Sequence, residues 1–288
     1  MTDKDIQARE ALMELLVEKC FIDPNEKIEH PPVAISLGEH SYMTKEGLQT
    51  YPTPIGTYGN FSFIQAPPKH KKTFLVSLLS AAYLGGTSKR FVGKIKGHRD
   101  GKCLYHFDTE QGRFHAQRTF RRVLDMCELE DQCYNTYGLR SLSHDERLDL
   151  IEHILKYSND VGVLVIDGVA DLVSDVNNIE ESNKVVGKIM KWTEEYQCHI
   201  ITVIHTNHNT NKPTGHLGSA LEKKAETQIQ LEKDENDTDI IKVKCKASRS
   251  KSFDDFSFFV NESGYPEVTE QELEVLDYIG KPKPKNRH

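Results

Sequence analysis

Three features of the sequence predict an α/β protein built around a mainly parallel sheet. Between about Asn60 and Val260, short runs of β-branched and aromatic residues alternate with helical stretches, as in βαβ units. Some of these runs are continuously apolar, as strands covered on both faces are. Polar residues follow several of them directly, at the sheet edge where ligands bind in open α/β sheets. The last strands follow one another without helices, which predicts an antiparallel C-terminal sheet edge.

The chain is predicted to consist of three parts. Residues 1–58 form an N-terminal extension, residues 59–262 the α/β domain and residues 263–288 a C-terminal tail. In the extension, apolar residues recur at roughly helical spacing ahead of a proline-rich loop, which predicts one short amphipathic helix. These apolar residues are Ile6, Leu12, Leu15, Leu16 and Cys20, and the prolines are Pro24, Pro31 and Pro32.

Seven strands and four helices are expected in the α/β domain. The strands are Phe61–Gln65, Cys103–Phe107, Gly162–Ile166, His199–Ile204, Thr227–Leu231, Ile240–Cys245 and Phe256–Val260. A helix over Thr73–Leu84 is apolar nearly all round and should be buried, whereas Arg113–Met126 and Ile179–Tyr196 are amphipathic. Ser143 and Glu146 form a capping box, which predicts a fourth helix to about Tyr157.

The composition argues against several classes of protein. With 37 Lys and Arg against 44 Asp and Glu, the net charge is -7, so the surface as a whole does not attract nucleic acid. The basic stretch over residues 89–102 is either a local phosphate-tracking patch or a solvated loop. The six cysteines contain no C-x-x-C pair, which argues against a disulfide framework or zinc ribbon. No apolar run approaches a membrane span and the start is polar, so we expect a cytoplasmic protein that does not bind membranes.

One segment has the layout of a phosphate-binding loop. A strand, a turn and a helix follow one another in FIQAPPKHKKTFLVSLLSAAYL, and Lys72 and Thr73 fit the phosphate-binding lysine and the magnesium-binding hydroxyl. The pattern G-x-x-x-x-G-K-[ST] lacks both glycines, because Ala66 and Lys71 stand in their places. We expect the phosphates to lie against the segment Lys69, His70, Lys71, Lys72, Thr73 and Phe74. The alternative is a basic turn ahead of a buried helix.

Polar side chains at three further strand ends support the first interpretation. Glu110 follows the strand in KCLYHFDTE, and a carboxylate there could polarise a water that attacks a γ-phosphate. Asp167 ends an apolar strand, where burial argues for a charged or metal partner such as Mg²⁺. His205 ends the next strand. Each residue alone has a structural interpretation, but together with Lys72 all four fall at the carboxyl ends of expected parallel strands.

The order of these features resembles the RecA-like P-loop ATPases, nearest to the hexameric RepA and DnaB-type helicase ATPases and the AAA-type proteins of mobile elements and phages. The resemblance covers roughly residues 59–260. It implies that Lys72 and Thr73 bind ATP and Mg²⁺, that Glu110 is the catalytic glutamate and that Asp167 is the Walker B aspartate. It implies that His205 is a sensor of the γ-phosphate.

The resemblance also implies partners. The segment GHLGSALEKKAETQIQL resembles a region that often faces the central channel in helicases, so contact with single-stranded nucleic acid is expected at Gly215, His216, Gly218 and Ser219. In KCKASRS, Lys246 and Arg249 resemble the basic pair that reaches a neighbouring subunit's γ-phosphate, which implies a homo-oligomer, and a hexamer is suspected.

The expected function is therefore an oligomeric ATPase that moves on single-stranded DNA in replication or in transfer of a mobile element. The alternative is a nucleotide-dependent assembly or regulatory module with weak or no hydrolysis. A filament-forming recombinase is a third candidate, against which stands the lack of an apparent polymerisation strand or helix-hairpin-helix module.

Overall fold

The computed structural model describes residues 3–45, 47–85, 92–127, 133–207 and 210–269. Its contacts divide the chain into two compact units, Met1–Pro31 and Pro32–His288. The first unit contains helix α1 (Asp3–Cys20), which confirms that a helix forms there. Its expected amphipathic character is not confirmed, because residues 4–20 are all exposed, including Leu12 and Leu15. None of the described helices is long and apolar enough to cross a bilayer.

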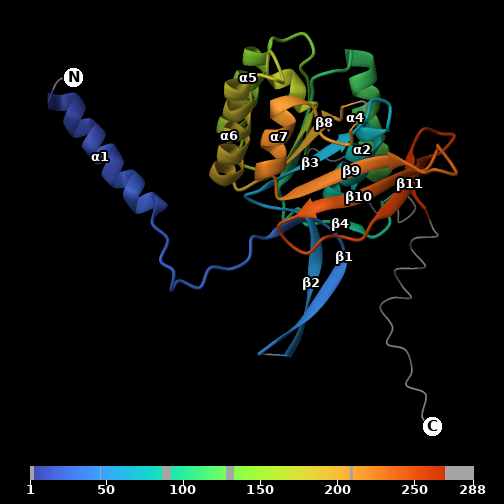
Figure 1. Ribbon diagram of the computed structural model, residues 1–288, viewed down its shortest axis with the longest axis horizontal. Helices are drawn as coiled ribbons and strands as arrows, with labels where there is room; N and C mark the ends of the chain where they lie inside the picture. Colours follow the sequence, from blue (N-terminus) through green and yellow to red (C-terminus); the bar gives the residue numbers. More distant parts are fainter. Residues whose placement is uncertain (1–2, 46, 86–91, 128–132, 208–209, 270–288) are drawn as a thin grey trace. The chain divides into compact units, whose positions relative to one another are not determined.

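The second unit is built on a nine-stranded sheet, shown in Figure 1, with the order β12-β11-β10-β9-β3-β8-β7-β5-β6. Six neighbouring strands are parallel: β3 (Phe61–Ala66), β5 (Cys103–Asp108), β6 (Tyr134–Gly138), β7 (Val161–Asp167), β8 (His199–His205) and β9 (Thr227–Lys233). Three strands extend the sheet antiparallel: β10 (Ile241–Ser248), β11 (Phe256–Val260) and β12 (Pro266–Val268). The predicted α/β class, with its antiparallel C-terminal edge, is thus confirmed.

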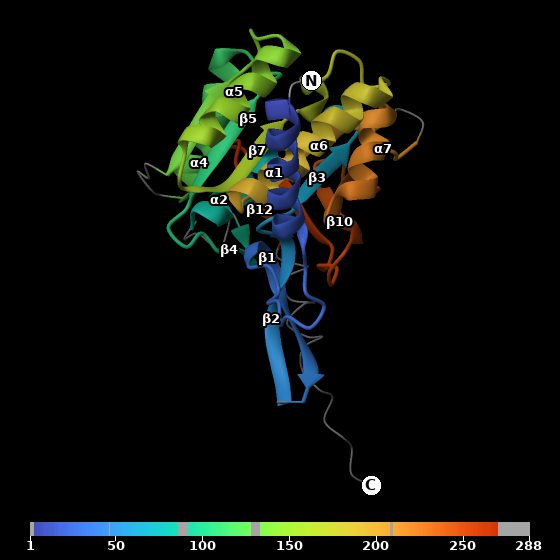
Figure 2. The same cartoon turned by 90° about the vertical axis from the view of Figure 1, so that its left-hand side faces the viewer.

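Helices cover both faces of this sheet, as the views in Figures 1 and 2 show. Their bounds are α2 (Lys72–Leu84), α4 (Arg113–Cys127), α5 (His144–Tyr157), α6 (Ile179–Tyr196) and α7 (Gly215–Lys224), with a short 3₁₀ turn at Val169–Leu172. Val163 and Val165 of β7 pack in one core with α2 and α4, whereas Leu164 and Ile166 pack in the other with α5, α6 and α7. Because both faces are covered, β7 is a continuous apolar run.

The capping box predicted at Ser143 is present at the start of α5. The Glu146 amide donates to Ser143 Oγ at 3.4 Å, and the Ser143 amide donates to the Glu146 carboxylate at 2.8 Å. The four helices expected in the α/β domain begin and end within one or two residues of their predicted bounds.

A second sheet of three strands, in the order β2-β1-β4, was not predicted. It consists of β1 (Val33–Thr44), β2 (Gly47–Thr57) and β4 (Ile95–Gly97), and Figures 1 and 2 show the β1–β2 hairpin extending away from the main sheet. Residues 33–57 were expected to belong to the N-terminal extension, in which one helix and a proline-rich loop were predicted and no strand. Two further prolines, Pro52 and Pro54, lie in β2, which is an edge strand, and proline is confined to such strands within sheets.

Two other strands were also missed. The edge strand β6 has the polar sequence YNTYG, which lacks the apolar pattern of the inner strands. The short strand β12 lies in the segment assigned to the tail, and residues 270–288 of that tail lie outside the described residues.

Candidate functional site

The loop between β3 and α2 has the backbone form of a phosphate-binding loop without its glycines. Lys69 and Lys71 have φ values of 62° and 57°, in the left-handed region that glycine favours. The Lys71 side chain turns away from the start of α2, and its Nζ donates to the carbonyl of Asp239 at 3.0 Å. Lys71 thus adopts the conformation of the glycine that it replaces, and its side chain does not block the helix N-terminus.

The amide groups of this loop are available to an anion. Within the described chain, the backbone N–H groups of residues 69–73 have no hydrogen-bond partner, as the first N–H groups of a helix normally do not. Phe74 differs, because its amide donates to the carbonyl of Lys71 at 3.0 Å. The geometry therefore offers the amides from Lys69 to Thr73 to phosphate oxygens, but not that of Phe74.

Lys72 lies buried at the centre of the site. Its Nζ contacts three acceptors: the carbonyl oxygens of Ala66 and Pro67, at 3.2 and 3.1 Å, and Nδ1 of His205, at 2.8 Å. Burial lowers the pKa of Lys72 to about 8, against the attraction of Glu110 and Asp167. The ammonium group therefore stands between the loop backbone and the carboxylates of the neighbouring strands.

Thr73 and Asp167 form the oxygen-rich part of the site. Thr73 Oγ1 donates to Asp167 Oδ2 at 2.9 Å, and Asp167 is buried at the end of β7. Burial raises the pKa of Asp167 to about 7, and the neighbouring carboxylates of Asp108 and Glu110 act in the same direction. A hydroxyl and a carboxylate fit Mg²⁺, which usually takes one or two protein oxygens together with phosphates and waters. Within the described residues there is no larger cluster of metal-ligating side chains.

Glu110 and His205 face each other across the site. Glu110 Oε1 lies 3.5 Å from Nε2 of His205, and the interactions with His205 and Lys72 lower the pKa of Glu110. Gly168 makes this position of Glu110 possible, since a Cβ at residue 168 would lie 2.8 Å from Glu110 Oε1. Four predicted residues, Lys72, Glu110, Asp167 and His205, are thus brought together.

Two neighbouring residues that position Glu110 were not predicted. The buried Asp108 carboxylate accepts hydrogen bonds from the amides of Glu110 and Gln111, at 3.1 and 2.7 Å. Thr109 Oγ1 accepts from the amide of Gly168 at 2.8 Å and so ties the turn after β5 to the turn after β7. An Asp two residues before a polar pair is the sequence signal of such an Asx turn.

Arg249 lies apart from this cluster, whereas Lys246 lies nearer, because its Nζ donates to the Asn211 carbonyl at 3.3 Å and the same carbonyl accepts from Gln65 at 3.1 Å. Ser248 of β10 pairs with Thr227 at the start of β9, on the sheet edge opposite the phosphate-binding loop. Lys246 Nζ lies 3.7 Å from Glu222 Oε1, and the guanidinium of Arg249 donates to the carbonyl of Lys224 at 2.8 Å. Neither residue reaches the site of its own chain, and their action on a neighbouring subunit stays a prediction.

The expected nucleic-acid segment forms the first turns of α7. Gly215 and Gly218 serve close packing, because a Cβ would lie 2.5 Å from the Val176 carbonyl oxygen at residue 215 and 2.6 Å from Pro213 at residue 218. His216 and Ser219 are exposed. Contact with a nucleic acid at these four residues stays a prediction.

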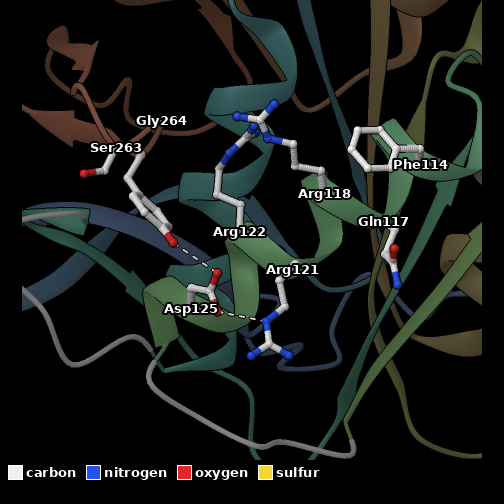
Figure 3. Close-up of a pocket in the computed structure, with 9 residues that line it drawn as sticks. Phe114, Gln117, Arg118, Arg121, Arg122, Asp125, Ser263 and Gly264 are labelled. Atoms are coloured by element: carbon white, nitrogen blue, oxygen red, sulfur yellow. Dashed lines mark hydrogen bonds and ion pairs between the residues drawn. The ribbon is translucent and has the colours of Figure 1, made fainter.

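A groove beside α4 adjoins the loop and was not predicted. It encloses about 470 Å³. Figure 3 shows its lining residues, Phe114, Gln117, Arg118, Arg121, Arg122, Asp125, Ser263, Gly264 and Tyr265. The guanidinium of Arg122 lies 3.9 Å from the ring centre of Phe74, which directly follows Thr73. Burial and the charge of Arg118 lower the pKa of Arg122 to about 10.

Comparisons with known proteins show the family and the fold of the chain. A family model described as AAA domain matches residues 56–211, more than half of the chain. No curated protein matches the sequence. A KaiC-like protein from the hyperthermophilic archaeon Pyrococcus horikoshii has a similar fold, with a TM-score of 0.52 and 14% identity over 74% of this chain and 90% of the archaeal chain. The chain therefore belongs to the AAA domain family and has the fold of a RecA-like P-loop ATPase.

Proposed function

We propose that the chain binds Mg-ATP at the loop between β3 and α2 and hydrolyses it. The observation that carries this proposal is the convergence of side chains from four strand ends in two hydrogen-bonded groups. Thr73 bonds to Asp167, Lys72 contacts His205, and His205 faces Glu110, all beside a helix N-terminus with free amides. These groups match what phosphoryl transfer to water needs, which is positioning and charge neutralisation.

Each group has a part in this reaction. The amides of residues 69–73 and the Lys72 ammonium bind the β- and γ-phosphate oxygens, as a helix N-terminus and a buried cation can. Thr73 and Asp167 would hold Mg²⁺, which would supply further charge neutralisation. Glu110 orients the attacking water and accepts its proton. His205 senses the γ-phosphate.

The groove beside α4 is our candidate site for the nucleotide base. Its walls carry the Tyr265 ring and the planar guanidinium groups of Arg118 and Arg122, and Arg122 also contacts the ring of Phe74, the residue after Thr73. Such planes stack on a purine or pyrimidine ring. Tyr265→Ala should therefore weaken binding of ATP but not of inorganic triphosphate, as measured by competition with a fluorescent nucleotide.

The cellular role that we propose is an oligomeric motor on single-stranded DNA, a helicase or translocase in replication or mobile-element transfer. The RecA-like fold supports it, together with the exposed His216 and Ser219 on α7. In this arrangement Lys246 and Arg249 of one subunit act on the nucleotide of the next. The alternative is an assembly or regulatory module. It is favoured by helix α1, whose exposed apolar side chains suit a protein partner.

Hydrolysis measurements with and without single-stranded DNA test these proposals. We expect Lys72→Ala and Glu110→Gln to abolish hydrolysis. The matched controls Lys184→Ala and Glu194→Gln change exposed residues of α6 and should leave it unchanged. Stimulation by DNA would support the motor, and hydrolysis without stimulation would favour the assembly module. Hydrolysis that survives Lys72→Ala would contradict the proposed site.

A further inference from the structure

We propose that His205 restrains the phosphate-binding lysine in the nucleotide-free protein, so that phosphate must displace the His205 imidazole from Lys72 and thereby also frees Glu110. This inference rests on the proposed ATP site and assigns a regulatory contact within it. The contact consists of the chain Lys72–His205–Glu110, whose two links are 2.8 Å and 3.5 Å long.

The number of N–H groups on Lys72 Nζ limits how many acceptors the ammonium group can bind. An ammonium group has three N–H bonds and no acceptor. Lys72 Nζ has three acceptors within reach, the carbonyls of Ala66 and Pro67 and the Nδ1 atom of His205. Every N–H group of the lysine is therefore engaged by the chain itself. A phosphate oxygen can bind this ammonium group only if one of the three contacts is given up.

Of the three contacts of the Lys72 ammonium group, the one with His205 is the one that a phosphate can displace. Ala66 and Pro67 offer backbone carbonyls, and the carbonyl of Ala66 is fixed in addition by the amide of Thr206 at 3.1 Å. His205 offers a side chain that can rotate about its own bonds. Its backbone stays in place, because the His205 carbonyl accepts from the amide and the hydroxyl of Thr214 at 3.0 and 2.8 Å. The imidazole is thus the movable partner on a fixed backbone.

The contact with Lys72 also determines the tautomer of the His205 imidazole. Because Nδ1 of His205 accepts from the Lys72 ammonium, the proton of a neutral imidazole is on Nε2, the atom that faces Glu110. One ring therefore connects the cation that binds phosphate to the carboxylate that orients water. When phosphate takes Lys72, the ring turns away and Glu110 loses this partner. Phosphate binding and the release of the glutamate are coupled through a single side chain.

The test compares ADP binding by the full-length protein and its variants. A hydrogen bond to a charged group contributes about 1.5–3 kcal/mol, so loss of the His205 contact should tighten ADP binding about tenfold or more. We expect this gain in His205→Ala, measured by anisotropy of a fluorescent ADP. In His205→Gln the amide oxygen can still accept from Lys72, so its ADP affinity should stay near that of the wild type. The matched control is His153→Ala, an exposed residue of α5.

The outcomes separate this inference from the proposed function. Unchanged or weaker ADP binding in a folded His205→Ala variant overturns the restraint, while the ATP site stands if the wild type binds ADP and Lys72→Ala does not. Failure of the wild type to bind ADP or ATP overturns both. Nitrogen NMR of the imidazole gives a second measurement that needs no variant. We expect the tautomer protonated at Nε2 without nucleotide and a shift on ADP binding, and a His205 resonance that ADP leaves unchanged would refute the restraint.

Discussion

Gly168 shows how closely the residues of the site are fitted. A Cβ at this position would lie 2.8 Å from Glu110 Oε1, so Gly168→Ala should displace the carboxylate and lower hydrolysis at least tenfold, the cost of a misplaced catalytic group. ADP binding should persist, because Lys72 and the loop amides are untouched. Steady-state hydrolysis and ADP titration give the two readouts.

Gly187 provides the matched control for this change. It lies in α6, and a Cβ there would meet nothing within 4 Å. Gly187→Ala should leave hydrolysis unchanged and raise helix stability by up to about 1 kcal/mol. Equal losses of hydrolysis in both variants would show that the close approach at Gly168 does not matter.

Asp167 predicts a pH dependence of stability. Its pKa is raised to about 7, so between pH 4 and 7 the folded chain binds a proton that the unfolded chain has released. The free energy of unfolding should then fall as the pH rises through this window, by up to about 1.4 kcal/mol per pH unit from this group. Urea unfolding without Mg²⁺ at pH 5, 6 and 7 should show a shallower fall in Asp167→Asn, and identical slopes would argue against the shift.

The conformation of Lys71 could not be predicted from the sequence. Lys71 stands where the loop pattern has glycine, and the sequence shows only the exchange. The left-handed backbone at Lys71 and its contact with Asp239 depend on the turn between β9 and β10, about 170 residues further along the chain. No local pattern reveals that contact.

Among the elements, α5 gives a test of a local signal. Ser143→Ala removes the side-chain acceptor of the capping box and should lower the free energy of unfolding by about 1 kcal/mol. Urea unfolding checks this, with Ser250→Ala, an exposed serine just after β10, as a control outside any helix. A loss of equal size in both variants would show that the cap contributes nothing particular.

Strands and helices could be predicted where a local pattern of apolar residues specifies them. The apolar strands β3, β7 and β8 and the buried helix α2 have strong periodic or continuous signals, and all were expected. The hairpin β1–β2 was not expected, and its strand β2 contains Pro52 and Pro54, which are compatible with a strand only at a sheet edge. Whether a strand lies at an edge depends on its neighbours, so the local sequence could not decide it.

In the proposed oligomer, each site is completed by a neighbouring subunit, so two inactive variants should complement each other when they are mixed. Arg249 lies away from the site of its own chain, so Arg249→Ala should reduce hydrolysis only by its effect on a neighbouring subunit. A trans-acting arginine contributes about 10³-fold or more to the rate. Mixing Arg249→Ala with Glu110→Gln should restore hydrolysis at interfaces that combine an intact glutamate with an intact arginine.

The control for this experiment is the same mixture at a concentration where the protein is monomeric, as light scattering determines. There the mixture should show no hydrolysis. Complementation that is absent from an assembled mixture, or an Arg249→Ala variant as active as the wild type, would contradict the trans role.

The sequence by itself determined the fold class and the main catalytic candidates, because Lys72, Glu110, Asp167 and His205 all follow expected parallel strands and such strands end at one edge of a sheet. The tertiary structure decided what lies between them: the contact of Lys72 with His205, the turn held by Asp108 and the groove formed by α4 and Tyr265. Strand ends are positioned by topology, which the apolar pattern specifies, whereas contacts between side chains distant in sequence depend on packing that no local pattern contains.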